Sequence, residues 1–247
     1  MNLQEFFRVY PKVALGFSGG VDSAYLLYAA CTCGAEIRPY FVKSQFQPEF
    51  ELEDARRLTE EMGLPLTVID CDVLSSAVIC DNPQNRCYHC KNMIFGKLME
   101  QAEKDGFDTI IDGTNASDDA DDRPGMMALA EMKVLSPLRL CGMTKDRVRV
   151  LSREAGLFTW DKPAYACLAT RMPCGEKITA EKLTRIEGAE ATLMSMGYSD
   201  FRVRYFHGAA RLQFKPAQLE QAAAQRREIR TGLKPYFDTV LIDLEER

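Results

Sequence analysis

The sequence predicts an α/β protein in which a largely parallel sheet with helices on both faces precedes a smaller α+β domain. A buried apolar strand at 13–17 runs through a Ser-Gly-Gly turn directly into a helical pattern. Strands and helices then alternate over about 155 residues, which is typical of βαβ units. After residue 178 the order changes to helix, two strands, helix and strand, which indicates a second domain.

The individual elements are justified by their periodicity and by the residues that end them. Strands are expected at 37–43, 66–70, 109–112 and 134–135, and helices at 24–33, 51–62, 87–104, 125–132 and 145–154. Glycines 34, 63, 106 and 156 follow four of these helices, as C-cap residues do. The second domain is expected to contain a helix at 179–196, strands at 201–206 and 211–215, a helix at 216–232 and a strand at 237–243. The turn between its first two strands contains His207 and Gly208, which indicates a hairpin.

The domain boundary is expected in the segment 159–178. This segment has no clean period and contains Pro163, Pro173 and Gly175. We therefore predict a first domain at 1–158, a cysteine-bearing linker or active-site loop at 159–178, and a C-terminal domain at 179–247.

The composition is that of a soluble globular protein. The chain has 247 residues, of which 46% are hydrophobic and 27% charged. The net charge of −5 disfavours a general polynucleotide binder. No apolar run reaches the roughly 20 residues that a membrane helix needs, and the N-terminus lacks the features of a signal peptide. We expect a cytoplasmic protein with neither membrane nor nucleic acid as a partner.

The loop at residues 18–23, with the sequence Ser-Gly-Gly-Val-Asp-Ser, is the strongest functional motif in the chain. Its glycines allow the backbone to approach an anion closely, and the unpaired N–H groups of the following helix point at the same place. It is not a Walker A loop, because the Gly-Lys-Ser/Thr ending is missing. The structural alternative is a turn in which Asp22 and Ser23 only cap the helix. Ser44 begins the loop after the second strand, at the sheet edge where ligands bind, and is a further candidate contact.

Four of the nine cysteines occur in two clusters, Cys87-Tyr88-His89-Cys90 and a second one bounded by Cys167 and Cys174. The start of a helix and the neighbouring Arg86 favour thiolates in the first cluster. Four interpretations remain open: a [4Fe–4S] cluster on three cysteines, a structural zinc on four, a reactive cysteine that donates sulfur, or thiols that only pack.

A basic strand follows in the second domain. Arg202 and Arg204 share one face of a strand, and Arg211 on the next strand can join them. Guanidinium groups arranged in this way suit a phosphate ligand, whereas the alternative is a solvated polar face. Residues 202–234 contain eight basic and two acidic residues, which favours an anionic partner.

The 18–23 loop resembles the PP-loop of ATP pyrophosphatases, whose fold is adenine nucleotide alpha-hydrolase-like. Further segments, in one order along nearly the whole chain, resemble one subfamily, the LarE-type ATP-dependent sacrificial sulfur transferases. These segments are 86–91, 112–115, 122–125, 136–138, 160–163, 167–171, 175–179 and 201–204.

The resemblance implies an enzyme that uses ATP and Mg²⁺ to adenylate a carboxylate of a pyridinium-3,5-dicarboxylate mononucleotide and then forms a thiocarboxylate. This reaction belongs to the biosynthesis of the nickel-pincer nucleotide of lactate racemase. The resemblance also implies a sulfide donor, a homo-oligomer, and a C-terminal domain that binds substrate and oligomerises. The residues implied in nucleotide binding are Ser18, Gly19, Gly20, Asp22, Ser23, Ser44, Gly113 and Arg123.

We assign catalysis to Asp22, Lys91 and Cys167. Lys91 and Lys162 are secondary candidates that would balance charge in the transition state, and the alternative for each is an ordinary surface lysine. We assign the substrate phosphate to Arg202, Arg204 and Arg211. In some members of the family a single cysteine gives up its sulfur and becomes dehydroalanine. In others three cysteines hold a [4Fe–4S] cluster that carries sulfide. Cys167 aligns with the sacrificial position, but Cys87 and Cys90 are present as well. We therefore expect Cys87, Cys90 and Cys167 to ligate a cluster.

The sequence departs from the family pattern at three positions. Cys174 stands in place of an aromatic residue, Gln213 in place of a carboxylate and Thr170 in place of serine.

Three alternative functions remain open. They are a tRNA thiolation enzyme, an amide-forming synthetase and a non-catalytic nucleotide-binding zinc protein. The first requires an RNA-binding surface, and the second has no use for the cysteines.

Overall fold

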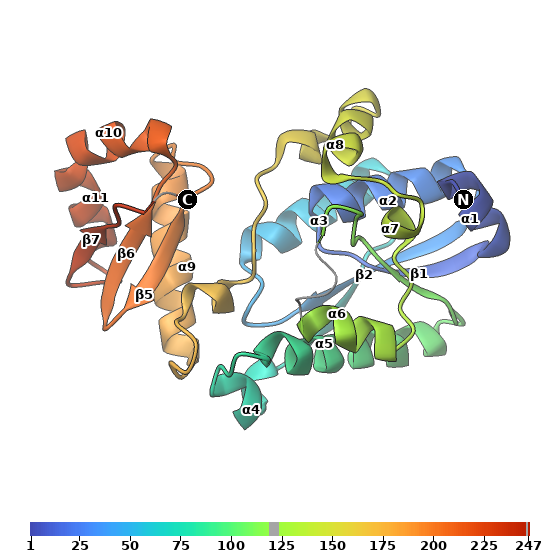
Figure 1. Ribbon diagram of the computed structural model, residues 1–247, viewed down its shortest axis with the longest axis horizontal. Helices are drawn as coiled ribbons and strands as arrows, with labels where there is room; N and C mark the ends of the chain where they lie inside the picture. Colours follow the sequence, from blue (N-terminus) through green and yellow to red (C-terminus); the bar gives the residue numbers. More distant parts are fainter. Residues whose placement is uncertain (119–123, 246) are drawn as a thin grey trace. The chain divides into compact units, whose positions relative to one another are not determined.

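A parallel four-stranded sheet organises the first part of the chain in this computed structural model, which describes residues 1–118, 124–245 and 247 (Figure 1). The strands are β1 (Lys12–Gly16), β2 (Glu36–Lys43), β3 (Thr67–Asp70) and β4 (Ile110–Asp112), in the spatial order β3-β2-β1-β4. All three pairings are parallel, and the bridge between Ile111 and Leu135 extends the sheet beyond β4. The predicted fold class is confirmed.

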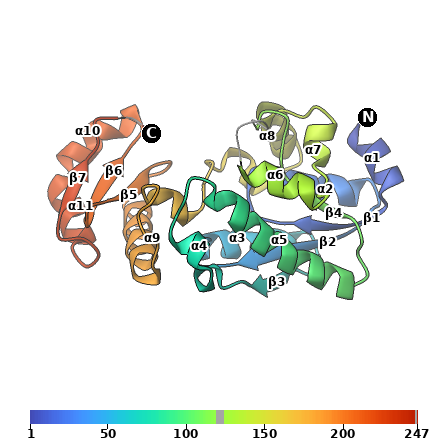
Figure 2. The same ribbon diagram turned by 60° about the horizontal axis from the view of Figure 1, so that its bottom comes forward.

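Helices cover both faces of this sheet, as the two views in Figures 1 and 2 show. They are α1 (Leu3–Val9), α2 (Val21–Thr32), α3 (Glu49–Glu61), α5 (Arg86–Lys104), α6 (Pro124–Glu131), α7 (Pro137–Leu140) and α8 (Lys145–Glu154). Val13 and Leu15 point into a core shared with α1, α2 and α3. Gly16, on the opposite face of β1, lies against Phe95 of α5. The alternation of side chains along one strand therefore serves two helical layers.

The C-terminal part is built on a separate three-stranded sheet. β5 (Arg202–Phe206) and β6 (Ala209–Gln213) are antiparallel, and β7 (Val240–Ile242) pairs with β6 in parallel. The predicted hairpin is present, and His207 and Gly208 both have positive φ in its turn. The helices here are α9 (Ala180–Ser195), α10 (Pro216–Ala224) and α11 (Arg226–Leu233), so the one helix expected at 216–232 is divided at Gln225.

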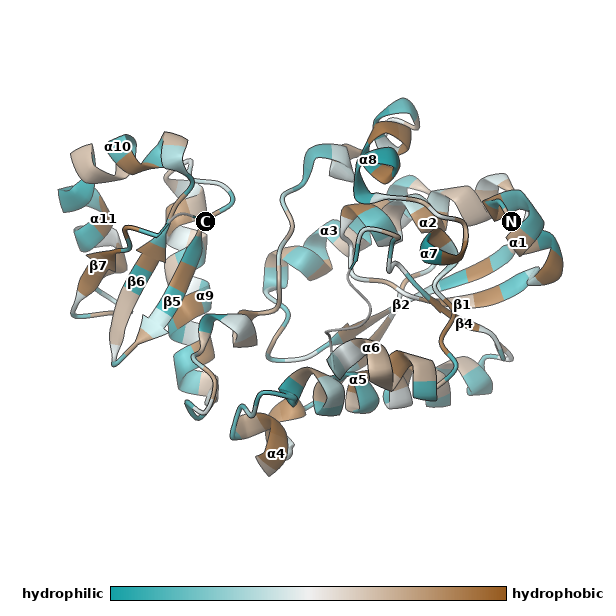
Figure 3. Cartoon of the chain, viewed as in Figure 1, coloured by the Kyte–Doolittle hydropathy of each residue, from teal (hydrophilic) through white to brown (hydrophobic). Residues whose placement is uncertain are grey.

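Two compact units divide the chain discontinuously. The first contains residues 1–73 and 85–162, and the second contains residues 74–84 and 163–247. The 74–84 segment carries α4 (Ala77–Cys80), which Figure 3 shows as hydrophobic. It joins the second unit through backbone bonds from Ile178 N to Cys80 O (2.7 Å) and from Gly175 N to Asn82 O (2.8 Å). The sequence analysis expected each domain to be one continuous segment, whereas residues 74–84 belong to the second unit.

Three short 3₁₀ helices complete the described elements: η1 (Val73–Ser75), η2 (Phe158–Asp161) and η3 (Leu168–Arg171). Among the helices that the described residues form, none is both long and apolar enough to cross a membrane.

Candidate active site

The 18–23 loop opens onto a cavity of about 300 Å³ in the first unit. Five of the residues predicted from the sequence line this cavity: Ser18, Asp22, Ser23, Lys91 and Gly113. The opposite wall is apolar and comes from β2 and α5, including Phe41, Ile94 and Phe95. A polar loop facing an apolar wall suits a nucleotide, whose base is apolar and whose phosphates are charged.

Hydrogen bonds among Ser18, Gly20 and Ser23 hold the conformation of the loop. Ser23 Oγ lies 3.1 Å from Ser18 Oγ and donates to Gly20 O at 3.1 Å, and Gly20 N donates to Ser18 Oγ at 3.3 Å. Gly19 has φ +69°, and a Cβ there would lie 3.0 Å from Glu51 O on α3. Glycine is therefore required at position 19 for both its conformation and its packing.

Asp22 is a largely buried acid that lines this cavity. Burial raises the pKa of its carboxyl group, and the hydrogen bond and charge of Lys145 oppose that rise. Lys145 Nζ donates to Asp22 Oδ2, whereas Asp22 Oδ1 is buried and has no hydrogen-bond partner within the described residues. The charge of Asp118, which lines the same cavity, also raises the pKa of Asp22.

Lys145 was missed by the sequence reasoning, although one local signal was present. It is the first residue of α8, after the N-cap Thr144. A cation at a helix N-terminus interacts unfavourably with the helix dipole. A lysine at this position therefore indicates that a carboxylate lies nearby. Asp22 is 123 residues away in sequence.

Lys162 lies beside the same loop. Its Nζ donates to Gly19 O at 3.3 Å and pairs with Asp54 of α3 at 2.6 Å. Lys91 lines the cavity from α5, with its Nζ 5.1 Å from the centre of the Phe95 ring. Three lysines, Lys91, Lys145 and Lys162, thus lie around the loop or the cavity, where negative charge on phosphates would be balanced.

One predicted nucleotide contact, Ser44, lies away from the cavity, and another, Arg123, cannot be compared. Ser44 is buried and outside the cavity lining, and its hydroxyl donates to Gln47 Oε1 at 2.6 Å, so that Gln47 reaches the cavity instead. Arg123 lies outside the described residues. Gly113 lies so close to α2 that a Cβ there would be 2.9 Å from Ser23 N.

The clustered cysteines are divided between the two units. Cys87 and Cys90 lie on the first turn of α5 in the first unit, and Arg86 Nη2 donates to Cys87 Sγ at 3.5 Å. Cys167 and Cys174 belong to the second unit, where Cys167 directly precedes η3. Across the described residues, no three His, Cys, Asp or Glu side chains gather into a group that could hold a metal ion.

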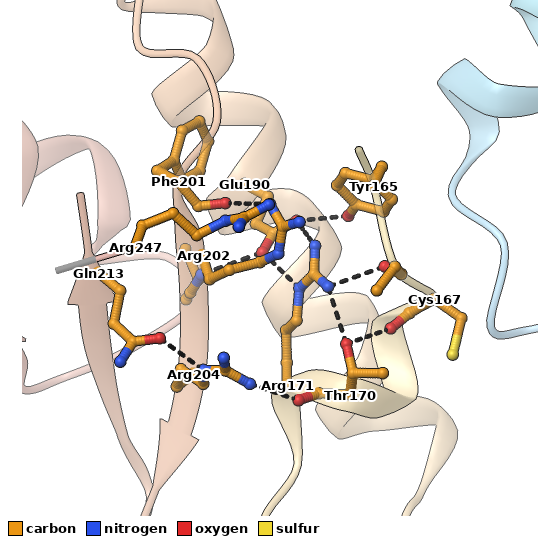
Figure 4. A network of polar contacts seen from close by, with 12 residues as sticks. Tyr165, Cys167, Thr170, Arg171, Glu190, Phe201, Arg202, Arg204, Gln213 and Arg247 are labelled. Atoms are coloured by element: carbon orange, nitrogen blue, oxygen red, sulfur yellow. Dashed lines mark hydrogen bonds and ion pairs between the residues drawn. The ribbon is translucent and has the colours of Figure 1, made fainter. Parts of the chain in front are cut away.

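The arginines of β5 lie next to the Cys167 segment in the second unit (Figure 4). Arg202 Nη2 donates to Ala164 O at 2.7 Å, and Arg204 Nη1 donates to Thr170 O at 2.7 Å. Arg247 Nη2 donates to the same Ala164 oxygen at 3.0 Å, so two guanidinium groups meet at one carbonyl. Arg247 was not predicted from the sequence, because nothing local connects it to β5. We call Arg202, Arg204 and Arg247 the arginine cluster.

The positive charges of the arginine cluster are partly buried and repel one another. Burial, followed by the charges of Arg171 and Arg247, lowers the pKa of Arg202 to about 10. Burial and the same neighbours, together with Arg211, also lower the pKa of Arg204. A phosphate dianion would relieve this repulsion, which makes the cluster a candidate anion site.

Arg211 lies directly opposite Arg204 across the hairpin, as expected, but it is engaged elsewhere. Its Nε lies 3.2 Å from Asp243 Oδ2, and its guanidinium lies over the Phe206 ring. Gln213 accepts from Arg204 Nε at 2.7 Å and donates to Asp243 at 3.0 Å. Gln213 therefore links Arg204 to Asp243 by hydrogen bonds.

A second cavity, of about 580 Å³, lies between α11 and the β6–β7 edge of the second unit. Three arginines of α11 line it: Arg226, Arg227 and Arg230. The basic residues of 202–234 therefore lie at two sites. Arg202 and Arg204 belong to the arginine cluster, and the three arginines of α11 line the second cavity.

Comparison with known proteins links these two units to sulfur transfer. No protein-family model matches the chain. It is 36% identical to an uncharacterised protein of Synechocystis sp., over 89% of this chain and 82% of that protein. It is 30% identical to pyridinium-3,5-bisthiocarboxylic acid mononucleotide synthase of Lactiplantibacillus plantarum, over 84% of this chain and 76% of the synthase. The tRNA-specific 2-thiouridylase MnmA of Treponema denticola is 28% identical, over 62% of this chain and 52% of that enzyme. Since the synthase matches along both units, the chain belongs to the LarE family of ATP-dependent sulfur transferases, within the PP-loop superfamily.

Proposed function

We propose that this enzyme adenylates a carboxylate of a pyridinium-3,5-dicarboxylate mononucleotide and converts it into a thiocarboxylate, a step in nickel-pincer nucleotide biosynthesis. The name of the Lactiplantibacillus plantarum relative supports this substrate class. The observation that carries the proposal is the arginine cluster beside Cys167. It offers a phosphate-binding group and a sulfur atom within one unit, as a mononucleotide that receives sulfur requires.

The first step activates the carboxylate. A carboxylate oxygen attacks the α-phosphorus of ATP, the bond to the β-phosphate oxygen breaks, and an acyl adenylate and pyrophosphate form. The N–H groups of the 18–23 loop and of the first turn of α2 would stabilise the departing pyrophosphate. Lys91, Lys145 and Lys162 would balance its charge.

Magnesium suits the acids of this cavity. The buried Asp22 Oδ1 has no hydrogen-bond partner among the described residues, and Asp118 lines the same cavity. Carboxylate oxygens are the ligands that Mg²⁺ prefers, and a cation here would offset the burial that raises the pKa of Asp22. Asp22 and Asp118 would hold the ion, which supplies charge for the phosphates.

The second step brings sulfur to the acyl carbon. A sulfide attacks this carbon, AMP leaves, and the thiocarboxylate forms. Cys87, Cys90 and Cys167 would provide three thiolates for a [4Fe–4S] cluster, and the donor chemistry fits, since two of the thiols share one helical turn beside Arg86. When bound, such a cluster would supply the sulfide.

Cys167 itself is the second candidate source of sulfur. In that case Cys167 Sγ attacks the acyl carbon and AMP leaves. The Cα proton of Cys167 then passes to a base while the Cβ–Sγ bond breaks, which yields the thiocarboxylate and dehydroalanine. The half-exposed position of Cys167 in the second unit supports this alternative.

The first experiment measures iron and acid-labile sulfide on protein purified without oxygen, for the wild type and Cys87→Ala. We expect about four of each per chain in the wild type and a loss in the variant. No iron, together with a loss of about 34 Da from Cys167 after turnover, the mass of one H₂S, would identify Cys167 as the donor. Zinc without pyrophosphate release from any substrate would contradict the proposed function.

A second experiment tests the substrate phosphate. Arg204→Gln should weaken binding of the pyridinium mononucleotide by about tenfold or more, because a charge-assisted contact is lost. Lys234→Gln, which removes a charge at the exposed end of α11 outside both cavities, is the control and should leave binding unchanged. Sulfur transfer to tRNA with no activity on the mononucleotide would favour the thiouridylase alternative.

A further inference from the structure

A buried ion pair lies behind Cys167 in the second unit (Figure 4). Arg171 is 0% exposed and Glu190 of α9 is 2% exposed. Arg171 Nε donates to Glu190 Oε1 at 2.8 Å and Nη2 donates to Oε2 at 3.1 Å, which is a two-pronged contact. Glu190 also accepts from Tyr165 Oη and, at 3.0 Å, from Val203 N of β5. Burying two charges costs desolvation energy, and the hydrogen bonds of this pair offset that cost.

The remaining donors of Arg171 hold the backbone around Cys167. Arg171 Nη1 donates to Ala166 O at 2.8 Å and to Thr170 Oγ1 at 2.9 Å. Thr170 Oγ1 in turn donates to Cys167 O at 2.8 Å. The peptide groups on both sides of Cys167 are therefore tied, directly or through one hydroxyl, to a single guanidinium.

The same segment is tied to the arginine cluster. Arg204 binds Thr170 O, and Arg202 and Arg247 bind Ala164 O. Glu190 completes a closed frame, because it accepts from the backbone of β5 between Arg202 and Arg204. Cys167 and the arginine cluster thus belong to one hydrogen-bonded frame.

We propose that Arg171 and Glu190 are positioning residues that hold Cys167 at a set distance from the arginine cluster; this inference rests on the proposed function. The phosphate and the carboxylate of a mononucleotide are separated by a fixed covalent framework. An enzyme that grips the phosphate and delivers sulfur near the carboxylate therefore needs a rigid spacer between the two sites. Arg171 with Glu190 is this spacer.

The test uses Arg171→Lys, which keeps the charge but loses the fork that binds Glu190 and Ala166 O together. We expect thiocarboxylate formation to fall by about tenfold or more, because small displacements of a reacting group are costly. Pyrophosphate release at saturating mononucleotide, a step assigned to the 18–23 loop of the first unit, should stay within about twofold. Equal losses in both steps would overturn the inference.

Thr170 gives a second pair of variants if Arg171→Lys does not fold. Thr170→Val removes the hydroxyl that links Arg171 to Cys167 O, whereas Thr170→Ser keeps it. Thiocarboxylate formation should fall in the valine variant and survive in the serine variant. A loss in both variants, or in neither, would overturn the inference.

A readout that is independent of the reaction separates this inference from the proposed function. The rate at which iodoacetamide alkylates Cys167, measured by peptide mass spectrometry on iron-free protein, should rise about threefold or more in Arg171→Lys and Thr170→Val and stay at the wild-type value in Thr170→Ser. Unchanged rates in all three variants would overturn the positioning role. A wild type that forms no thiocarboxylate, but shows these alkylation differences, would overturn only the proposed function.

Discussion

Gly113 shows how one missing side chain shapes the candidate active site. It follows β4 and lies against the first turn of α2, where a Cβ would be 2.9 Å from Ser23 N and 3.2 Å from Ser23 Cα. The N–H groups that would hold the pyrophosphate belong to this turn. The close approach of two backbones therefore fixes where the 18–23 loop borders the cavity.

Gly113→Ala is expected to destabilise the protein by about 1–3 kcal/mol, as overpacking does, and to lower pyrophosphate release. Gly96→Ala is the control, because a Cβ at position 96 of α5 meets nothing within 4 Å. That change should stabilise the protein by about 0.5–1 kcal/mol, since alanine favours a helix. Thermal unfolding and a pyrophosphate assay measure both effects, and equal responses of the two variants would contradict the prediction.

Lys145 is expected to affect how far the pH can fall before pyrophosphate release declines. Burial raises the pKa of Asp22 and Lys145 opposes that rise, so Lys145→Gln should raise the pKa of Asp22 further. Ionised Asp22 is the form that would hold magnesium. As the pH is lowered, pyrophosphate release should therefore begin to decline at a higher pH in the variant than in the wild type. The pH profile of pyrophosphate release measures this shift. Lys104→Gln, at the exposed end of α5, should not move the profile.

At the scale of elements, the end of α5 is fastened to β2 by a small polar cluster. Tyr40 Oη donates to Asp105 Oδ2 at 2.8 Å, and Arg38 pairs with the same oxygen at 3.0 Å. Asp105 is the C-cap of α5, so these contacts hold the helix that carries Cys87 and Cys90 against the sheet. Burial, followed by the Asp105 contact, raises the pKa of Tyr40 to about 12.

This cluster predicts a pH-dependent stability. The hydrogen bond from Tyr40, and then Arg38, lower the pKa of Asp105 below its ordinary value of 3.8. A carboxyl group with a lowered pKa stabilises the fold above its ordinary pKa, and this contribution is lost as the pH falls through the folded-state value. Asp105→Asn should therefore be less stable than the wild type at neutral pH, and the difference should shrink in acid.

Urea unfolding measured from about pH 7 down to about pH 3 follows that difference. Asp108→Asn is the matched control, because Asp108 is exposed on the surface. A difference between Asp105→Asn and the wild type that stays constant over this range would contradict the assigned contacts.

At the scale of the whole molecule, the two units carry different chemistry. The first unit contains the 18–23 loop and its cavity, and the second contains Cys167 and the arginine cluster. A ligand stabilises the part that it binds, by about 2.7 kcal/mol when present at 100 times its Kd. The two units should therefore respond to different anions.

Hydrogen exchange tests this division. A non-hydrolysable ATP analogue with Mg²⁺ should protect β1, the 18–23 loop and the start of α2. Inorganic phosphate alone should protect β5 and residues 164–171, which contact the arginine cluster. Phosphate that protects the 18–23 loop but leaves β5 unchanged would contradict the placement of the substrate phosphate.

Local patterns were sufficient to predict most elements. The strand at 13–17, the helix at 87–104 and the hairpin turn at His207-Gly208 follow from periodicity, capping and turn chemistry, which act within a few residues. The 18–23 loop was identified for the same reason. The division of the helix at 216–232 was missed, because neither glycine nor proline marks the break at Gln225.

The sequence by itself determined the parallel sheet, the 18–23 loop, the hairpin that carries Arg202, Arg204 and Arg211, and the residue types that resemble those of a sulfur transferase. Only the tertiary structure decided the partners of the charged side chains. Lys145 binds Asp22, Lys162 binds Gly19 O, and Arg202 and Arg247 both bind Ala164 O. The tertiary structure also decided that residues 74–84 pack with the second unit. The physical reason is that periodicity and turn chemistry are local, whereas the partner of a buried charge is chosen by packing between segments far apart in sequence.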